Sequence, residues 1–301
     1  MIRLGLCCIF KDQPIRFRRA TAAFLARLPV PEQRRRLSEI CLANAENLKK
    51  ALVFCQENGI GDFRVNSQIL PLKTHPGVGY DMADLPDGDT IIKTFAACGR
   101  FAGKHHLRTS FHPDQFIILS SPDPAVVARS VADLRYQAEV ARWINADVIN
   151  IHAGGAYGDK PAALERLKKA VGRLPGPVRK RLTLENDDIS YSPRDLLPVC
   201  ADLAVPLVYD VHHHRCLPDD LSIEEASRLA VATWDREPLF HISSPKNGWH
   251  SPDIRKHHDY IDVRDFPECW RSLDLTIEVE AKAKELAVLK LKEALKSKGV
   301  V

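Results

Sequence analysis

The 301-residue sequence has no apolar run long enough to cross a membrane, since a spanning helix needs about 18 or more such residues. The apolar run near the N-terminus, between Arg3 and Lys11, is too short for a secretory signal. These two features lead us to expect a cytoplasmic protein. The eight cysteines form no CxxC pair and several lie in apolar segments, which predicts buried free thiols rather than disulfides or a zinc ribbon.

The sequence also lacks a linker rich in proline, glycine or serine, and it lacks a short-period repeat. We therefore expect one domain over residues 1–301, with no obligate protein partner evident. The net charge of +4 permits a polyanionic partner without requiring one. Basic clusters at 16–19 and 34–36 could contact phosphates, and they are equally compatible with solvated surfaces.

Strand-like apolar runs alternate with helical patterns along the whole chain, which is typical of βα units and a parallel sheet. The predicted strands cover residues 2–6, 62–65, 108–111, 147–152, 181–185, 206–210, 239–242 and 275–280. The predicted helices include residues 37–58, 90–104, 124–144, 161–172, 192–203, 223–233 and 281–296. Eight strands in about 300 residues favour an α/β fold of the (β/α)8 TIM-barrel type over an open sheet.

Four longer irregular stretches follow predicted strands one, two, six and seven. They cover residues 11–33, 68–88, 213–222 and 243–262. Loops that follow the strands of a parallel barrel lie on its C-terminal face, which is where barrel enzymes carry their active sites. We therefore expect the functional site at this face.

Metal-competent side chains recur at the ends of these predicted strands. A single histidine at such a place would usually cap a strand or bond a buried carbonyl, but here the pattern repeats at strand after strand. The residues concerned are His112, His152, Glu185, Asp210, His241 and Glu280, with His213 three residues after Asp210 and with His75 and His257 in the long loops. This set predicts a cluster of two or three divalent ions. Two ions a few ångströms apart can activate a water and stabilise a leaving oxygen in one displacement.

The chain also resembles a known family, the ultraviolet damage endonucleases, nearly end to end. The runs that carry this resemblance are FRV (63–65), THP (74–76), FHPDQF (111–116), SPDP (121–124), LRY (134–136), HAGGAYGDK (152–160), LENDD (184–188), DVHHH (210–214), HISS (241–244), HHDYI (257–261) and EAKAKE (280–285). The resemblance implies a TIM barrel related to apurinic-site endonuclease IV. It also implies a cluster of up to three metals, commonly Mn²⁺, that nicks damaged double-stranded DNA on the 5′ side of a photoproduct.

The resemblance further implies roles for individual residues. One ion would be held by His112, His152 and Glu185, and Glu185 would bridge to a second ion held by Asp210, His241 and Glu280. The third ion would be held by His213 and His257. We assign catalysis to Glu185, His75 and Lys160, and DNA contact to Gln115, Phe116, Arg64 and Tyr157.

Gln115 and Phe116 stand where the family has a glutamine–tyrosine pair that enters the duplex as the damaged dinucleotide is flipped. An aromatic wedge can replace lost base stacking, and the amide can pair with an orphaned base edge. An in-line attack would then leave a 3′-hydroxyl and a 5′-phosphate.

Two positions depart from relatives in this family. Leu6 stands where one branch has a tyrosine after Arg-Leu-Gly, and a leucine can wedge but cannot stack or donate a hydrogen bond. Leu239 stands where some relatives have a lysine at the metal site. Both departures bear on the range of lesions and the number of ions more than on the nicking chemistry.

Three other functions remain compatible with a metal-bearing barrel. The same fold serves metal-dependent sugar isomerases and epimerases, and it serves cleavage at apurinic sites. A damage sensor that binds without turnover is the third. The histidine-rich ligand set and the His-Pro-x-Gln-aromatic motif argue against the isomerases.

Overall fold

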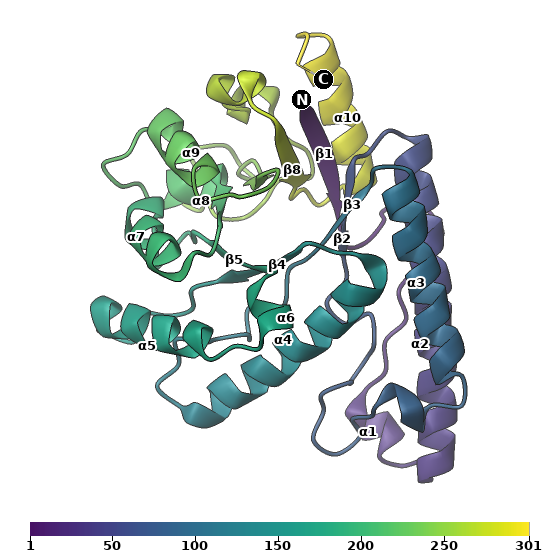
Figure 1. The fold of residues 1–301 in the computed structure, drawn as a ribbon. Coiled ribbons are helices and arrows are strands. Elements are labelled where there is room, and N and C mark those ends of the chain that lie inside the picture. Colours follow the sequence, from purple (N-terminus) through teal and green to yellow (C-terminus); the bar gives the residue numbers. More distant parts are fainter. Residues whose placement is uncertain (301) are drawn as a thin grey trace.

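The computed structural model describes residues 1–300, in which eight parallel strands form a closed barrel in the order of the chain (Figure 1). The strands are β1 (Ile2–Cys7), β2 (Asp62–Val65), β3 (Arg108–Phe111), β4 (Val148–His152), β5 (Leu182–Glu185), β6 (Leu207–Asp210), β7 (Leu239–Ile242) and β8 (Leu275–Val279). The α-helices are α1 (Ala22–Leu25), α2 (Val30–Glu57), α3 (Gly88–Lys104), α4 (Pro124–Ile144), α5 (Lys160–Gly172), α6 (Gly176–Arg179), α7 (Pro193–Leu203), α8 (Val211–Cys216), α9 (Ile223–Val231) and α10 (Glu285–Lys296). The predicted (β/α)8 TIM barrel is confirmed.

The register of the barrel brings the predicted ligands side by side. His152 of β4 pairs with Glu185 of β5, and Asp210 of β6 pairs with His241 of β7. Since all strands run in parallel, these strand ends meet at one mouth. Because successive side chains on a strand point to opposite faces, every second residue of each strand points into the barrel.

Outward-facing strand residues pack against the helices and form the main hydrophobic core, in which Leu6, Phe63, Phe111 and Leu184 are fully buried. Inside the barrel the apolar filling is small. Val148, Val208 and Leu239 form a separate fully buried cluster there, packed against Trp234. Most other inward positions are polar, so the interior depends on paired charges and hydrogen bonds rather than on apolar packing alone.

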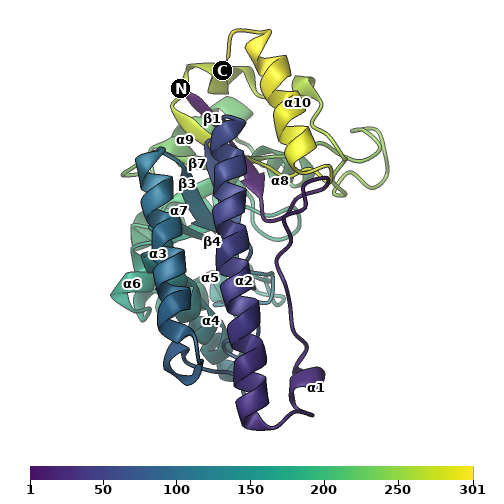
Figure 2. The same cartoon turned by 90° about the vertical axis from the view of Figure 1, so that its right-hand side faces the viewer.

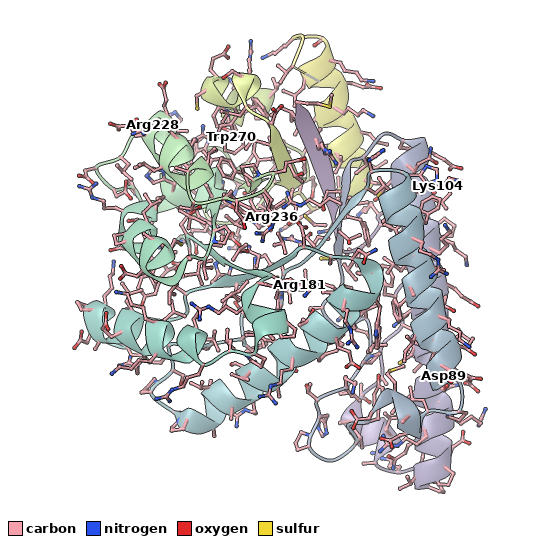
Figure 3. The ribbon with its side chains drawn as sticks, in the orientation of Figure 1. Asp89, Lys104, Arg181, Arg228, Arg236 and Trp270 are labelled. Atoms are coloured by element: carbon pink, nitrogen blue, oxygen red, sulfur yellow. The ribbon has the colours of Figure 1, made fainter. Side chains whose placement is uncertain are left out.

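The amino-terminal end of the barrel is closed by an ion-pair network around Asp147. Arg108 contacts this carboxylate at 2.8 Å, and the guanidinium of Arg236 approaches it at 3.4 Å. Figure 3 shows Arg236 and Arg181 near the middle of the ring of helices. This network covers the end opposite to the predicted site.

Two long helices, α2 and α3, lie side by side along one flank (Figure 2). Helix α2 begins at Val30, seven residues before the start predicted from the sequence, and the predicted irregular stretch 11–33 also holds the short helix α1. The signal for the earlier start is Pro31 at the first turn with Glu32 beside it. The prediction was wrong here because the three arginines at 34–36 interrupt the apolar period.

Two further boundaries differ from the prediction. Residues 211–216 form helix α8 directly after β6, although 213–222 was predicted to be irregular. The last helix begins at Glu285 instead of 281, because residues 281–284 make a turn that contacts the loop after β7. Asp210 caps the first of these segments and makes it helical, whereas contacts with residues 258 and 259 override helical propensity in the second. Among the described residues, no helix combines the length and the apolar character that crossing a bilayer requires.

Candidate metal centre

Seven of the predicted ligands converge at the mouth of the barrel. Three sets of potential ligand atoms each lie within 4.8 Å of one another. The sets are His112, His152 and Glu185; His112, His241 and Glu280; and Glu185, Asp210 and His213. Because the sets share His112 and Glu185, they form one continuous cluster.

Glu185 occupies the centre of this cluster and is fully buried. One carboxylate oxygen lies 2.8 Å from Nε2 of His112, and the other lies 3.1 Å from Nδ1 of His241. The side-chain amide of Asn150 donates to Glu185 Oε2 at 2.5 Å. A carboxylate with a different histidine at each oxygen is suited to bridge two ions.

Asp210 joins the cluster to helix α8. Its Oδ1 accepts a hydrogen bond from the backbone N–H of His213 at 2.8 Å, so the aspartate caps the helix that presents this histidine. Its other oxygen, Oδ2, is buried without a hydrogen-bond partner and faces His213 and His241 at 3.6 and 3.9 Å. A buried, unpartnered carboxylate oxygen among histidines fits a divalent cation, because an ion would satisfy the charge that the protein leaves unpaired.

His257 lies at the edge of the cluster, with Nδ1 3.7 Å from Glu280. His213 groups with Glu185 and Asp210, and its ring centroid is 6.3 Å from that of His257. The prediction placed His213 and His257 together at a third ion. In the structure, His213 lies closer to Glu185 and Asp210 than to His257. The ligand set and its division among ions stay predictions.

Glu278 is a buried carboxylate beneath the cluster that sequence reasoning missed. It lies 3.0 Å from Nε2 of His241 and accepts a hydrogen bond from Ser110. With Nε2 held in this way, Nδ1 of His241 faces Glu185 and Glu280. The signal was available, since Glu278 is two residues before Glu280 and must share its face of the strand.

Arg64 reaches the cluster from inside the barrel. Its guanidinium lies 2.6 Å from Glu280 and 3.0 Å from Glu278, and the residue is buried. Arg64 was predicted to contact DNA. In the structure the side chain orients two carboxylates, and phosphate contact stays a prediction.

The cluster also shifts the pKa values of its members. Burial alone would raise the pKa of Glu185, but the charges of His241, His152 and His112 hold it well below its usual range. Burial alone would lower the pKa values of His241 and His213. The neighbouring carboxylates outweigh the effect of burial and raise the pKa values of both histidines well above the usual value. In the absence of metal, the carboxylates therefore favour the protonated form of these two imidazoles, and a bound ion would compete with that proton.

We expect metal loading to release protons. Because the pKa values of His213 and His241 are raised in the folded state, protonation of these histidines stabilises the metal-free fold. This stabilisation is fully present below the unfolded-state histidine pKa of about 6.5 and is lost as the pH rises through the raised pKa values of the folded protein. Affinity for Mn²⁺ should therefore increase with pH. Titration calorimetry of metal-stripped protein in buffers of different ionisation enthalpy measures the released protons. Loading without proton release would contradict these assignments.

Three of the residues predicted to contact DNA lie in the loops that follow β3 and β4. Gln115 and Phe116 lie in the loop after β3, and Phe116 is 72% exposed. Tyr157 is half-exposed in the loop after β4. An aromatic side chain left this open in a loop at the mouth is free to meet a ligand.

His75 and Lys160, both predicted to act in catalysis, lie outside the three ligand sets. Nδ1 of His75 accepts from the backbone N–H of Gly77 at 3.1 Å, and the residue lines a cavity that Phe116 also lines. Nζ of Lys160 contacts Asp195 at 2.9 Å. Their catalytic roles stay predictions.

The two departures at leucine positions have structural explanations. Leu6 is fully buried on the outer side of β1, so the expectation that it could wedge into DNA is wrong. Leu239 faces into the barrel on the same side of β7 as His241, and it packs with Val148 and Val208 below the cluster. A buried leucine in an apolar cluster therefore occupies the position where some relatives have a lysine.

Comparison with known proteins extends this picture over the whole chain. The family model described as "UV-endonuclease UvdE" matches residues 2–301. The chain belongs to this family. It is 35% identical over 300 residues to the "UV DNA damage endonuclease" of Bacillus velezensis, covering 96% of this chain and 91% of that protein. It is also 37% identical over 283 residues to the "UV-damage endonuclease" of Neurospora crassa, covering 87% of this chain and 42% of that longer protein.

Solved structures agree with the family assignment. The crystal structure of SacUVDE superposes with a TM-score of 0.89 at 25% identity, covering 100% of both chains. Endonuclease IV of Thermus thermophilus follows with a TM-score of 0.59 at 14% identity, over 83% of this chain and 93% of the other. At that identity the second likeness shows the fold alone.

Proposed function

We propose that this UvdE-family protein is a metal-dependent DNA repair endonuclease that nicks the phosphodiester on the 5′ side of UV photoproducts, leaving a 3′-hydroxyl and a 5′-phosphate. The observation that carries the proposal is the cluster of histidines and carboxylates around Glu185, within a chain of this family. Its substrate would be damaged double-stranded DNA. Its cofactor would be two or three divalent ions, with Mn²⁺ the expected metal.

The chain's own residues would each serve a defined part of this reaction. Divalent ions held by the cluster would supply an activated water and would neutralise charge that develops on the phosphate. Glu185 would provide ligand oxygens at the centre of the cluster. Arg64 and Glu278 would fix Glu280 and His241 from below, so that the ligands need no rearrangement when ions bind.

Lesion recognition would depend on the exposed loop after β3. Gln115 and Phe116 are exposed there, in a loop that begins directly after His112. Insertion of Phe116 into the base stack would compensate for stacking lost when a damaged dinucleotide leaves the duplex. A photoproduct is already poorly stacked, so it would be extruded at a lower cost than normal bases.

A sugar epimerase is the second candidate, because D-psicose 3-epimerase from Clostridium cellulolyticum superposes with a TM-score of 0.60 at 13% identity. This value equals that for endonuclease IV within 0.01, so the fold does not separate the two activities. The family match favours the endonuclease. The convergence of seven of the predicted ligands supports turnover over a sensor that only binds.

Nicking of supercoiled plasmid tests the proposal. Metal-stripped protein, with and without restored Mn²⁺, would be incubated with irradiated, unirradiated and depurinated plasmid. We expect nicking of irradiated plasmid only with metal. Nicking of depurinated plasmid alone would indicate an apurinic-site endonuclease, and nicking of none would favour the epimerase or the sensor.

A further inference from the structure

A small lysine-lined pocket lies beside the metal cluster, and we propose that it binds a DNA backbone phosphate adjacent to the scissile one, through Lys282 and Lys284. The inference rests on the proposed function and adds a subsite to it.

The pocket has a volume of about 270 Å³ and touches the metal cluster directly. Its lining includes Arg64, Lys256, His257, Glu280, Lys282 and Lys284. Pockets for drug-sized ligands usually begin at about 300 Å³, so this one suits a phosphate group with its water better than a whole nucleotide. Because two predicted metal ligands form one wall, a group bound here would lie next to the ions.

The cationic side chains of this pocket differ in whether they form ion pairs with carboxylates. Arg64 is paired with Glu278 and Glu280, and Lys256 lies 2.6 Å from Asp253. In contrast, over residues 1–300 neither Lys282 nor Lys284 has a carboxylate within 4.0 Å in an ion pair. Two ammonium groups without a protein counter-charge, in a concave site, favour an anionic ligand.

The backbone at Lys284 is strained in a way that only glycine adopts easily. Its φ is 53° and its ψ is −122°, a combination that places the β-carbon of an L-residue in close contact with its own backbone. Strained residues persist where the surroundings over-determine them, and they cluster at ligand clamps. A functional role for the side chain would account for a lysine at a position where glycine would fit better.

Neighbouring contacts hold this turn in place from two sides. The backbone N–H groups of Lys282 and Ala283 donate to the loop after β7, at His258 and Asp259, at 3.1 and 2.9 Å. On the other side, the buried carboxylate of Glu285 accepts three backbone N–H bonds from residues 11–13 in the loop after β1. The strained lysine is therefore fixed between two loops of the C-terminal face.

The salt dependence of substrate binding tests the subsite. For duplex DNA, each lysine–phosphate contact contributes about 0.9 to the slope of log affinity against log salt, or about fivefold in affinity near 0.15 M salt. We expect Lys282→Ala and Lys284→Gln holoenzymes to show a slope lower by about that amount and a KM raised about fivefold on a UV-damaged duplex, with unchanged metal content. The matched control is Lys104→Ala, an exposed lysine at the end of α3 on the molecule's outer edge (Figure 3).

Lys284→Gly separates a binding role from a structural one. Glycine relieves the backbone strain, so the unfolding midpoint should stay the same or rise while the KM and the salt slope change as in Lys284→Gln. Lys284→Arg keeps the charge and should retain wild-type affinity. Unchanged KM and slope in Lys284→Gly, or a lower midpoint with loss of metal, would overturn the proposal.

Wild-type behaviour distinguishes failure of this inference from failure of the proposed function. If wild-type holoenzyme nicks damaged DNA and the lysine variants match it, only the subsite is wrong. If wild-type protein neither binds nor nicks damaged DNA, the endonuclease function itself is wrong.

Discussion

Replacing Glu185 with glutamine is expected to reduce nicking of UV-damaged DNA by at least about 10³-fold, since metal assistance is worth several kcal/mol and each 1.36 kcal/mol is about tenfold in rate. The carboxylate lies between His112 and His241, with a different oxygen facing each. Glutamine has nearly the same shape but offers only one ligand oxygen. It would therefore lose the bridge between two ions while keeping the packing.

The readouts for Glu185→Gln are bound metal per protein, the unfolding midpoint and the rate of nicking. We expect fewer bound ions along with the loss of rate. Glu57→Gln, at an exposed position at the end of α2, is the matched control and should behave as wild type. Nicking within tenfold of wild type by a folded Glu185→Gln protein would show that Glu185 is not the bridging ligand.

Replacing Phe116 with alanine is expected to lower kcat/KM on UV-damaged duplex by about 5- to 160-fold, because stacking on an aromatic side chain is worth about 1–3 kcal/mol per base. The side chain is 72% exposed, so its removal should leave the unfolding midpoint and the metal content unchanged. Phe116→Tyr keeps the ring and should retain activity.

A second substrate makes this prediction specific to base flipping. When the damaged site is placed in an unpaired bubble, the bases around it are already unpaired, so insertion of Phe116 is less important for extruding the lesion. Phe116→Ala should therefore recover most of its activity there. An equal loss on paired and unpaired substrates would indicate that Phe116 acts in some other way, and no loss on either would remove it from recognition.

The sequence predicted the barrel because its signals are local. Apolar runs of four to six residues separated by helical periods give parallel strands, and the acids and histidines at their ends follow from the chain direction alone. His152 beside Glu185, and Asp210 beside His241, are consequences of strand order in a closed barrel. No long-range information was needed to gather these groups at one mouth.

Features that depend on contacts between distant segments could not be predicted in this way. The pairing of Arg64 with Glu280 joins residues 216 positions apart in the chain. Similarly, the turn at 281–284 is set by the loops after β1 and β7, although its own sequence predicted helix. The helix at 211–216 arises because Asp210 caps it, a local signal that the histidine run obscured.

The barrel interior also limits which changes the site can accept. A side chain on Gly5 would bring its β-carbon within 2.6 Å of Asp62 Oδ2 and 3.2 Å of Glu278 Cγ. Asp62 is fully buried, and burial together with the charge of Glu278 raises its pKa well above the usual value. The floor beneath the cluster is thus tightly packed, and Glu278 within it contacts His241.

Mapping the cut on a defined substrate is the most direct test of the central claim, that this cluster cleaves DNA on the 5′ side of a photoproduct. The substrate would be a 5′-end-labelled duplex with a single cyclobutane pyrimidine dimer, incubated with metal-stripped protein before and after Mn²⁺ is restored. We predict one labelled product, made only with metal, that ends immediately 5′ of the dimer in a 3′-hydroxyl that a polymerase can extend. Cleavage that does not require metal, that falls elsewhere, or that occurs equally on undamaged duplex would contradict the account.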